Sequence, residues 1–199
     1  MALLLKGAPV SAEIVEKSRE AVAELKSEGI SPTLAILRVG ARSEDESYVR
    51  GAKKRCAEVG VDVVEKNLPE DVSSTDFFGT LEELNDDSAV HGILMLRPLP
   101  KHLDEERARC LIAPQKDIDG CTDLSLAGVF TNAPLGFPPC TAQAAIEILD
   151  HYGIECAGKN VVVIGRSLVV GRPVSLLLQH KNATVSMCHS RSKDIPALA

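Results

Sequence analysis

The chain carries the sequence NVVVIGRS at residues 160–167, an apolar, β-branched run that ends at a glycine. Such a run is typical of a buried strand. Apolar residues then recur at helical spacing over 169–180, and a second apolar run occupies 184–188. The order strand, glycine turn, helix, strand builds the first half of a dinucleotide-binding fold. Residues 141–199 are therefore expected to begin a nucleotide-binding lobe.

The glycine turn after the first of these strands departs from the usual G-x-G-x-x-G pattern, so Gly165 as a plain turn glycine stays open as an alternative. The end of the second strand is more informative. Enzymes that bind NAD usually place Asp or Glu about 20 residues further on, to bind the ribose hydroxyls. This chain has His189, Ser190 and Arg191 there. With Arg166 they predict a cationic, hydrogen-bonding pocket for a 2′-phosphate, which favours NADP over NAD.

Upstream of this lobe, strand-like and helix-like segments alternate. Short apolar runs predict strands at residues 33–39, 61–65 and 90–96. Helical spacing predicts helices that start at Ser11, near Glu46 and at Ser73 or Ser74. Near-continuous apolar strands that alternate with helices imply parallel pairing, with helices on both faces of a sheet. The predicted fold class is therefore α/β, with a parallel N-terminal lobe at residues 1–140.

A less regular passage joins the two predicted lobes. A helix is predicted at 105–111, and the residues from there to Pro139 lack periodicity and are expected to form a long loop. A helix over 142–152, capped by Thr141, is expected to connect the lobes. Because long irregular passages in compact proteins usually carry function or mark a boundary, this loop is a candidate part of the site.

Composition and charge narrow the class of partner. The net charge of −6 gives no sign of the basic stripes that neutralise nucleic-acid phosphates. No apolar run approaches the roughly 20 residues that span a bilayer, and the N-terminus is too short for a signal-peptide core. The six cysteines are scattered without a C-x-x-C pair, which predicts reduced thiols and no metal site. A cytoplasmic protein with a small-molecule substrate, no nucleic acid and no membrane is expected.

Five segments together resemble one family. They are GRSLVVGRP at 165–173, PCT at 139–141, KDIDG at 116–120, HGIL with PLP at 91–94 and 98–100, and SYV with EVG at 47–49 and 58–60. In this order they are similar to motifs of the bifunctional methylenetetrahydrofolate dehydrogenase/cyclohydrolase (FolD) family, over essentially all of the chain. The resemblance implies a folate-binding catalytic lobe, a Rossmann lobe for NADP, and oxidation of 5,10-methylenetetrahydrofolate to the methenyl form. It also implies a homodimer formed through the Rossmann lobes.

The resemblance also implies roles for single residues. Tyr48 would lie against the aminobenzoyl ring of the folate, and Asp119 would accept hydrogen bonds from the pterin, as a carboxylate can from two parallel donors. These two are the candidate catalytic residues. Taken alone, Tyr48 fits a packing residue and Asp119 an Asp-Gly turn equally well. The wall of the folate cleft would be formed by Pro98, Leu99 and Pro100. The cofactor would be bound by Gly165, Arg166, Ser167, Val170, His189, Ser190 and Arg191.

Two positions depart from the family's pattern. Where the family's cyclohydrolase uses a Lys one helical turn after the Tyr and a Gln on the third strand, this chain has Ala52 and Leu96. Lys53, at i+5 from Tyr48, is rotated by roughly 140° and should point away from it, as should Lys54. Both are expected to be solvated surface charges. The hypothesis is a dehydrogenase with weak or absent cyclohydrolase activity. A bifunctional enzyme and a non-catalytic folate-binding protein are the alternatives.

Two further features stay open at this level. Arg97 stands where the pattern has an apolar Leu, and it should face the cleft or a carboxylate, because an unpaired buried guanidinium is costly. Family members also continue beyond the position of Ala199 with further elements of the Rossmann lobe. The C-terminal lobe is therefore expected to be truncated, with only the half that binds the adenosine phosphate.

Overall fold

The computed structural model describes residues 3–198. The chain forms two compact units. The first unit is Ser11–Ile118, and the second unit is Asp119–Ala199 together with Met1–Val10. The functional division at residue 140 stays a prediction, because the boundary between compact units describes packing and not function.

The first unit is built on a three-stranded parallel sheet in the order β2-β1-β3. Its strands are β1 (Thr33–Val39), β2 (Asp62–Leu68) and β3 (Gly92–Met95). β1 lies in the middle and is buried over Ala35, Ile36 and Leu37, whereas β2 is an edge strand on which exposed and half-buried residues mix. The predicted α/β class with parallel pairing is confirmed.

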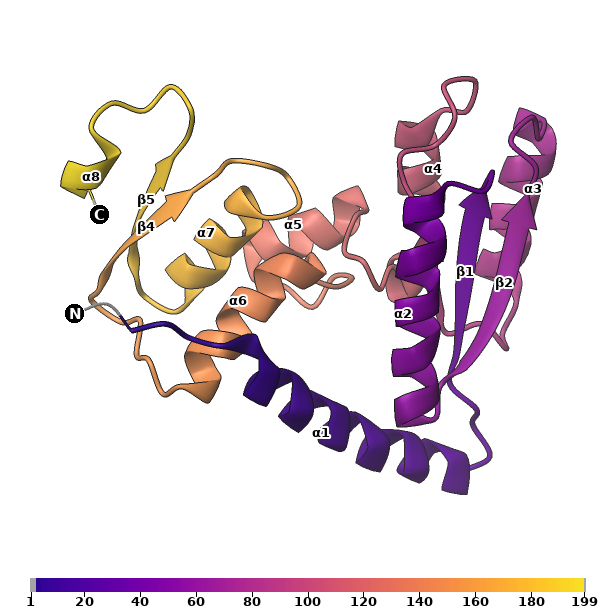
Figure 1. The fold of residues 1–199 in the computed structure, drawn as a ribbon, viewed down its shortest axis with the longest axis horizontal. Helices are drawn as coiled ribbons and strands as arrows, with labels where there is room; N and C mark the ends of the chain where they lie inside the picture. The colour runs from indigo at the N-terminus through magenta and orange to yellow at the C-terminus, as the bar shows by residue number, and fades with distance from the viewer. Residues whose placement is uncertain (1–2, 199) are drawn as a thin grey trace. The chain divides into compact units, whose positions relative to one another are not determined.

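Helices cover both faces of this sheet. The helical segments of this unit are α1 (Gly7–Ser27), whose first residues belong to the second unit, α2 (Ser43–Val59), α3 (Ser74–Asp86), α4 (Glu105–Leu111) and the 3₁₀ turn η1 (Pro114–Lys116), of which α2 and α3 cover the two faces. Figure 1 shows α2 on one side of β1 and β2, and α3 on the other. Because β2 and β3 flank β1 on opposite sides, the right-handed crossovers through α2 and α3 must pass over opposite faces.

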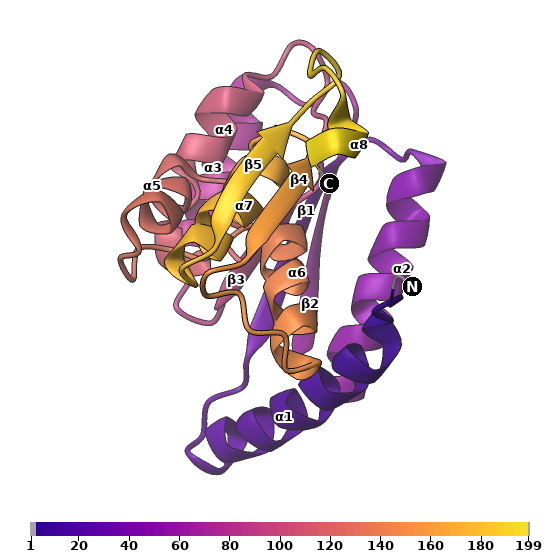
Figure 2. The same ribbon diagram turned by 90° about the vertical axis from the view of Figure 1, so that its left-hand side faces the viewer.

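The second unit contains a two-stranded parallel sheet of β4 (Asn160–Ile164) and β5 (Thr184–Cys188). Its helices are α5 (Asp123–Thr131), α6 (Cys140–His151), α7 (Gly171–His180) and α8 (Ile195–Leu198). Figures 1 and 2 place α6 and α7 on the same side of the β4–β5 pair. Ala142 and Ile146 of α6 pack there with Val174 and Leu178 of α7. The strand-helix-strand unit predicted from NVVVIGRS is confirmed.

Three local predictions were wrong. The first helix begins at Gly7 and not at Ser11. The passage expected to be a long loop contains α5, which Thr122 caps by accepting from the Ser125 N–H at 3.1 Å. Apolar residues occupy all sides of α5, so it lacks the one-sided spacing that predicts a helix. Thr141 does not cap α6, because Pro139 occupies the cap position and the helix has already begun at Cys140.

Of the two serines predicted to start the third helix, Ser73 is the cap, since its Oγ accepts from the Asp76 N–H at 3.1 Å. Within residues 3–198, no helix is long and apolar enough to cross a membrane.

Candidate functional site

The first unit has a cavity of about 220 Å³, here called the switch cavity, at the carboxyl end of its sheet. It is lined by Val39, Gly40, Ala41 and Arg42 after β1, by Glu70 after β2, and by Pro98, Leu99 and Pro100 after β3. The chain passes from β1 through α2 to β2 on one side of β1, and then from β2 through α3 to β3 on the other side, so the strand order reverses at β1. Ligands of open α/β sheets bind in the crevice at the carboxyl ends of the strands at such a point. The three residues predicted to form the cleft wall line this cavity.

The walls of the switch cavity are fixed by hydrogen bonds. Leu99 N–H donates to Glu105 Oε2 at 2.8 Å, and the Pro100 carbonyl accepts from Leu103 N–H at 3.0 Å. On the opposite wall, Arg42 donates from Nε and Nη2 to the two carboxylate oxygens of Asp45, at 2.8 and 2.9 Å. A planar guanidinium that is held by two parallel bonds loses most of its freedom. The cavity is therefore bounded by ordered groups on both sides.

The two residues predicted to replace a polar hydrolytic pair, Ala52 and Leu96, meet in one apolar cluster. Leu96 is 7% exposed and packs with Ile36, Val49 and Leu94, and Ala52 packs against the same cluster. Tyr48, one turn before Ala52, is 57% exposed on the flank of α2. The two residues that depart from the family's pattern therefore lie in the same cluster. A Lys or Gln in either place would bring a polar group against aliphatic side chains.

Lys53 lies on the other flank of α2. Its ammonium donates to Glu65 Oε1 on β2, and this hydrogen bond lowers the pKa of the Glu65 carboxyl below its usual value. The position agrees with the prediction that Lys53 points away from Tyr48. Lys53 is exposed, as expected for a solvated surface charge, and its ion pair in addition links α2 to β2.

The KDIDG motif closes the first unit. Lys116 Nζ donates to the carbonyls of Leu84, Asn85 and Asp87 at the end of α3, at 3.1, 2.7 and 2.7 Å. These carbonyls have no partner in the next turn of a helix, so the ammonium satisfies them. Asp119 follows as the first residue of the second unit and is half-buried. Its role and its place beside Tyr48 stay predictions.

Gly120 joins the KDIDG motif to the PCT motif. It has φ +64, and a Cβ there would lie 2.5 Å from backbone atoms of Pro138 and Pro139. Only glycine fits such an approach at a positive φ. Two motifs that are about twenty residues apart therefore pack directly against one another.

The carboxyl ends of β4 and β5 lie side by side. Ile164 pairs with Cys188, and Gly165 N–H donates to the Cys188 carbonyl at 2.8 Å. Arg166 and His189, the next residues, therefore leave the sheet at the same edge. Four other predicted cofactor residues lie in the same two turns, and all four are exposed: Ser167, Val170, Ser190 and Arg191.

The glycine turn holds α7 close to the end of β4. Ser167 Oγ accepts from the N–H groups of Val170 and Gly171 at 3.1 and 3.4 Å, and caps the start of the helix. A Cβ on Gly171 would lie 2.2 Å from the Gly165 carbonyl oxygen. Gly165 itself has φ +144, and nothing lies within 4 Å of a Cβ built on it. This backbone faces open space, as required where a dinucleotide approaches the turn.

Sequence reasoning missed Ser192 in the turn after β5. His189 N–H donates to Ser192 Oγ at 2.9 Å, and Arg191 N–H donates to His189 Nδ1 at 3.1 Å. With Nδ1 as acceptor, a neutral His189 carries its proton on Nε2. The signal was present, because a serine hydroxyl can close a turn by bonding a nearby backbone group, and Ser192 lies three residues after His189.

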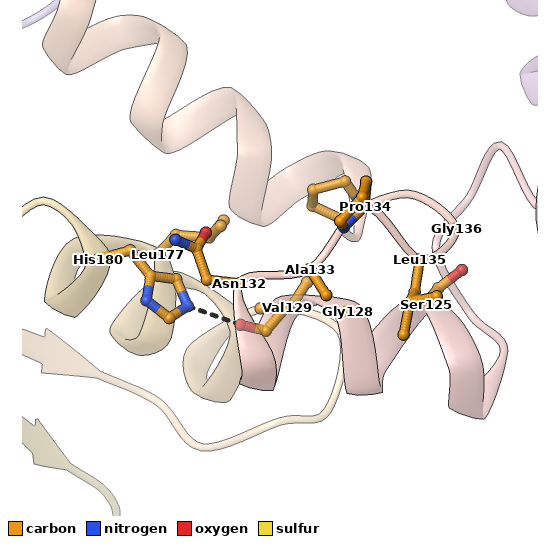
Figure 3. A pocket seen from close by; sticks show the side chains of 11 residues that line it. Ser125, Gly128, Val129, Asn132, Ala133, Pro134, Leu135, Gly136, Leu177 and His180 are labelled. Carbon is orange, nitrogen blue, oxygen red and sulfur yellow. Dashed lines mark hydrogen bonds between the residues drawn. The ribbon is translucent and has the colours of Figure 1, made fainter.

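A second cavity, of about 300 Å³, lies in the second unit between α5, the loop after it, and α7. In Figure 3, Asn132 and His180 lie at one end and Ser125 at the other. His180 Nε2 donates to the Val129 carbonyl at 2.7 Å. None of the predicted site residues lines this cavity.

Among residues 3–198 no group of three or more His, Cys, Asp or Glu could hold a metal ion.

The fold and the two sheet edges define an α/β protein with a crevice for a small molecule and a dinucleotide-binding lobe. Residues 5–119 match the catalytic domain of tetrahydrofolate dehydrogenase/cyclohydrolase, and residues 139–199 match its NAD(P)-binding domain. The chain belongs to the tetrahydrofolate dehydrogenase/cyclohydrolase family. The predicted family and two-lobed fold class are confirmed.

Relatives and solved structures agree with this membership. The chain is 48% identical over 198 residues to the bifunctional protein FolD of Alkaliphilus oremlandii, covering 100% of this chain and 70% of the relative. The bifunctional FolD structure from Campylobacter jejuni has a TM-score of 0.94 at 35% identity, covering 99% of this chain and 70% of that one. FolD from Trypanosoma brucei, solved with NADP and an inhibitor, has a TM-score of 0.89 at 33% identity, covering 99% and 68%.

Proposed function

We propose that the protein is an NADP-dependent 5,10-methylenetetrahydrofolate dehydrogenase of folate one-carbon metabolism. The proposal rests on what lies at the carboxyl ends of the strands in the two sheets. The first sheet has the switch cavity after β1 and β3, and the second has an exposed glycine turn after β4 and a basic segment after β5. We assign folate binding to residues 1–140 and cofactor binding to residues 141–199. In the reaction, a hydride leaves the one-carbon bridge of the folate, NADP accepts it, and the products are the methenyl form and NADPH.

The residues of the first lobe hold the folate. Pro98, Leu99 and Pro100 form an ordered wall of the switch cavity. Tyr48 offers an exposed ring for stacking on the aminobenzoyl group, and the Asp119 carboxylate accepts hydrogen bonds from the pterin. Hydride transfer requires mainly that the two reacting carbons are held together and that water is kept out. The apolar cluster under Ala52 and Leu96 suits the second requirement.

The residues of the second lobe bind NADP. The Gly165 turn, with Ser167 capping α7, presents backbone to the pyrophosphate, and Val170 completes the turn. Arg166 and the segment His189–Arg191 supply the positive charge and donors that a 2′-phosphate requires. We place the enzyme in the cytoplasm, as a homodimer formed through this lobe.

Cyclohydrolase activity is proposed to be weak or absent. Hydrolysis of the methenyl group needs a polar side chain that activates or positions water, and such groups contribute about 10²–10⁴-fold. Ala52 and Leu96 supply none, and both pack in the apolar cluster. The second candidate function is the bifunctional enzyme, which is favoured by the similarity to FolD proteins described as bifunctional.

Two assays on one preparation separate these candidates. NADPH formation from 5,10-methylenetetrahydrofolate tests the dehydrogenase, and the loss of methenyltetrahydrofolate absorbance tests the cyclohydrolase. We expect NADP-dependent turnover, with hydrolysis close to the spontaneous rate. Hydrolysis far above that rate, unchanged by Lys53→Ala or Lys54→Ala, would establish the bifunctional enzyme. Folate binding without NADPH formation would instead establish a non-catalytic binding protein.

A further inference from the structure

The wall formed by Pro98, Leu99 and Pro100 contains a single backbone N–H group. Proline has none, so Leu99 provides the only backbone donor of the three residues. Proline also fixes its own φ and restricts the residue before it, which leaves the orientation of the Leu99 amide as the main freedom of this wall. The group that accepts a hydrogen bond from the Leu99 N–H therefore fixes the conformation of this wall.

Glu105 is the acceptor. Its Oε2 takes the Leu99 N–H at 2.8 Å in a half-buried position. The two neighbouring carboxylates have other partners. Asp104 caps α4 by accepting from the Arg107 N–H at 2.9 Å. Glu106 is 86% exposed and forms an ion pair with Arg109. Three consecutive acidic residues thus have three different partners. Of these, only Glu105 bonds a residue that lines the switch cavity.

We propose that Glu105 is a positioning residue for the folate substrate, an inference that rests on the proposed function. By holding the Leu99 amide, the carboxylate fixes the wall in the shape that contacts the substrate. Without it, the N–H must find water, because a buried donor left without an acceptor is costly. The wall would then sample other orientations, and part of the binding energy would be used to order it again.

The role is specific to one substrate. Glu105 and Leu99 belong to the first unit, whereas the predicted NADP residues belong to the second. Loss of the hydrogen bond should therefore raise the KM for 5,10-methylenetetrahydrofolate and leave the KM for NADP unchanged. A merely structural role would lower thermal stability and affect both substrates alike.

The test compares Glu105→Ala, Glu105→Gln and the matched control Glu106→Ala in the full chain. Measured quantities are kcat, both KM values, the melting temperature, and the Kd for tetrahydrofolate by calorimetry. For Glu105→Ala we expect the folate KM and the tetrahydrofolate Kd to rise roughly tenfold, since a hydrogen bond to a charged group has about this value. Glu105→Gln should stay within about twofold of the wild type because the amide oxygen still accepts. Glu106→Ala should change nothing.

Several results would overturn the inference. They are an unchanged folate KM and Kd in Glu105→Ala, an equal rise in the KM for NADP, or a failure of Glu105→Gln to rescue. If the wild type binds tetrahydrofolate but forms no NADPH, the proposed function fails alone, and the calorimetric Kd values still decide the role of Glu105. If the wild type does not bind tetrahydrofolate, both proposals fall.

Discussion

The two sheets of the protein end very differently at their carboxyl edges. In the first unit, the two strands that flank the switch cavity most closely end on buried apolar side chains: β1 at Val39, 7% exposed, and β3 at Met95, 4% exposed. In the second unit, β5 also ends on a buried residue, Cys188, but β4 ends at Ile164, which is 68% exposed, and Leu168 in the turn after it is 51% exposed. The first edge is a cavity with side-chain walls. The second is a bare backbone turn.

This difference reflects what each edge is proposed to bind. A folate has ring faces that are recognised by packed side chains, and these must be fixed in advance by hydrogen bonds such as Leu99 to Glu105. A pyrophosphate is recognised by backbone N–H groups, and these need a glycine turn that nothing covers. Substitutions should therefore act through side-chain packing at the first edge and through backbone approach at the second.

The largest effect is expected for Gly171→Ala. The new Cβ would lie 2.2 Å from the Gly165 oxygen, so α7 must move away from β4. We expect a loss of roughly 1–3 kcal/mol in the free energy of unfolding, as for overpacking, and at least about tenfold weaker NADP binding. Urea unfolding and NADP titration measure the two effects. The control is Gly79→Ala in α3, where nothing lies within 4 Å and a gain of about 0.5–1 kcal/mol is expected. If the two variants had the same unfolding free energy and the same NADP affinity, close backbone approach would not be what the glycine turn after β4 requires.

A smaller effect on stability, but a gain of activity, is expected for Ala52→Lys combined with Leu96→Gln. These changes restore the polar pair and should raise methenyltetrahydrofolate hydrolysis by about tenfold or more. Placing an amide in the cluster should cost about 1–3 kcal/mol in unfolding free energy. Leu96→Met is the control, and it should cost less than about 1.5 kcal/mol without any hydrolysis. If the double variant hydrolyses no faster than the wild type, the two residues do not explain the activity.

Lys53→Ala should have little effect. The ammonium is half-exposed and bonds Glu65 on the flank of α2 away from Tyr48. We expect a change in unfolding free energy of at most about 1 kcal/mol, and unaltered dehydrogenase and hydrolysis rates. Lys54→Ala serves as the comparison on the same helix. A fall in either rate for Lys53→Ala alone would place its side chain in the reaction.

The smallest effect concerns pH. The hydrogen bond from Lys53 lowers the pKa of Glu65, so folding is favoured by the ionised carboxylate. This stabilisation is present above the unfolded pKa, about 4.3, and is lost as the pH falls through the lower folded value. The difference in unfolding free energy between wild type and Glu65→Gln should be constant from about pH 7 to 5 and shrink below about pH 4. Urea unfolding across this range measures it, and a difference that grows on acidification would contradict the assignment.

Sequence patterns predicted β1, β3 and β4 well because each is a short apolar run between turn residues, whereas the prediction for β2 stopped at residue 65 because charged and polar residues follow there. They failed for α5, since Leu124 and Phe130 are exposed while Val129 is buried, and no single stripe results. The spacing of the family's motifs identified Ala52 and Leu96 as the replaced positions. That the two lie in one cluster depends on how α2 crosses the sheet, which the spacing does not give. The bond from Glu105 to Leu99 could not be predicted. It joins a helix start to a loop, and no periodic rule relates the two.

The charges along β2 have a consequence for behaviour in concentrated solution. As an edge strand it offers unpaired backbone groups to which another chain could add. Asp62, Glu65 and Lys66 place ionised groups of both signs along this strand, and any chain that approached in register would have to strip water from them. We expect this border of the molecule to resist intermolecular strand addition and fibril growth.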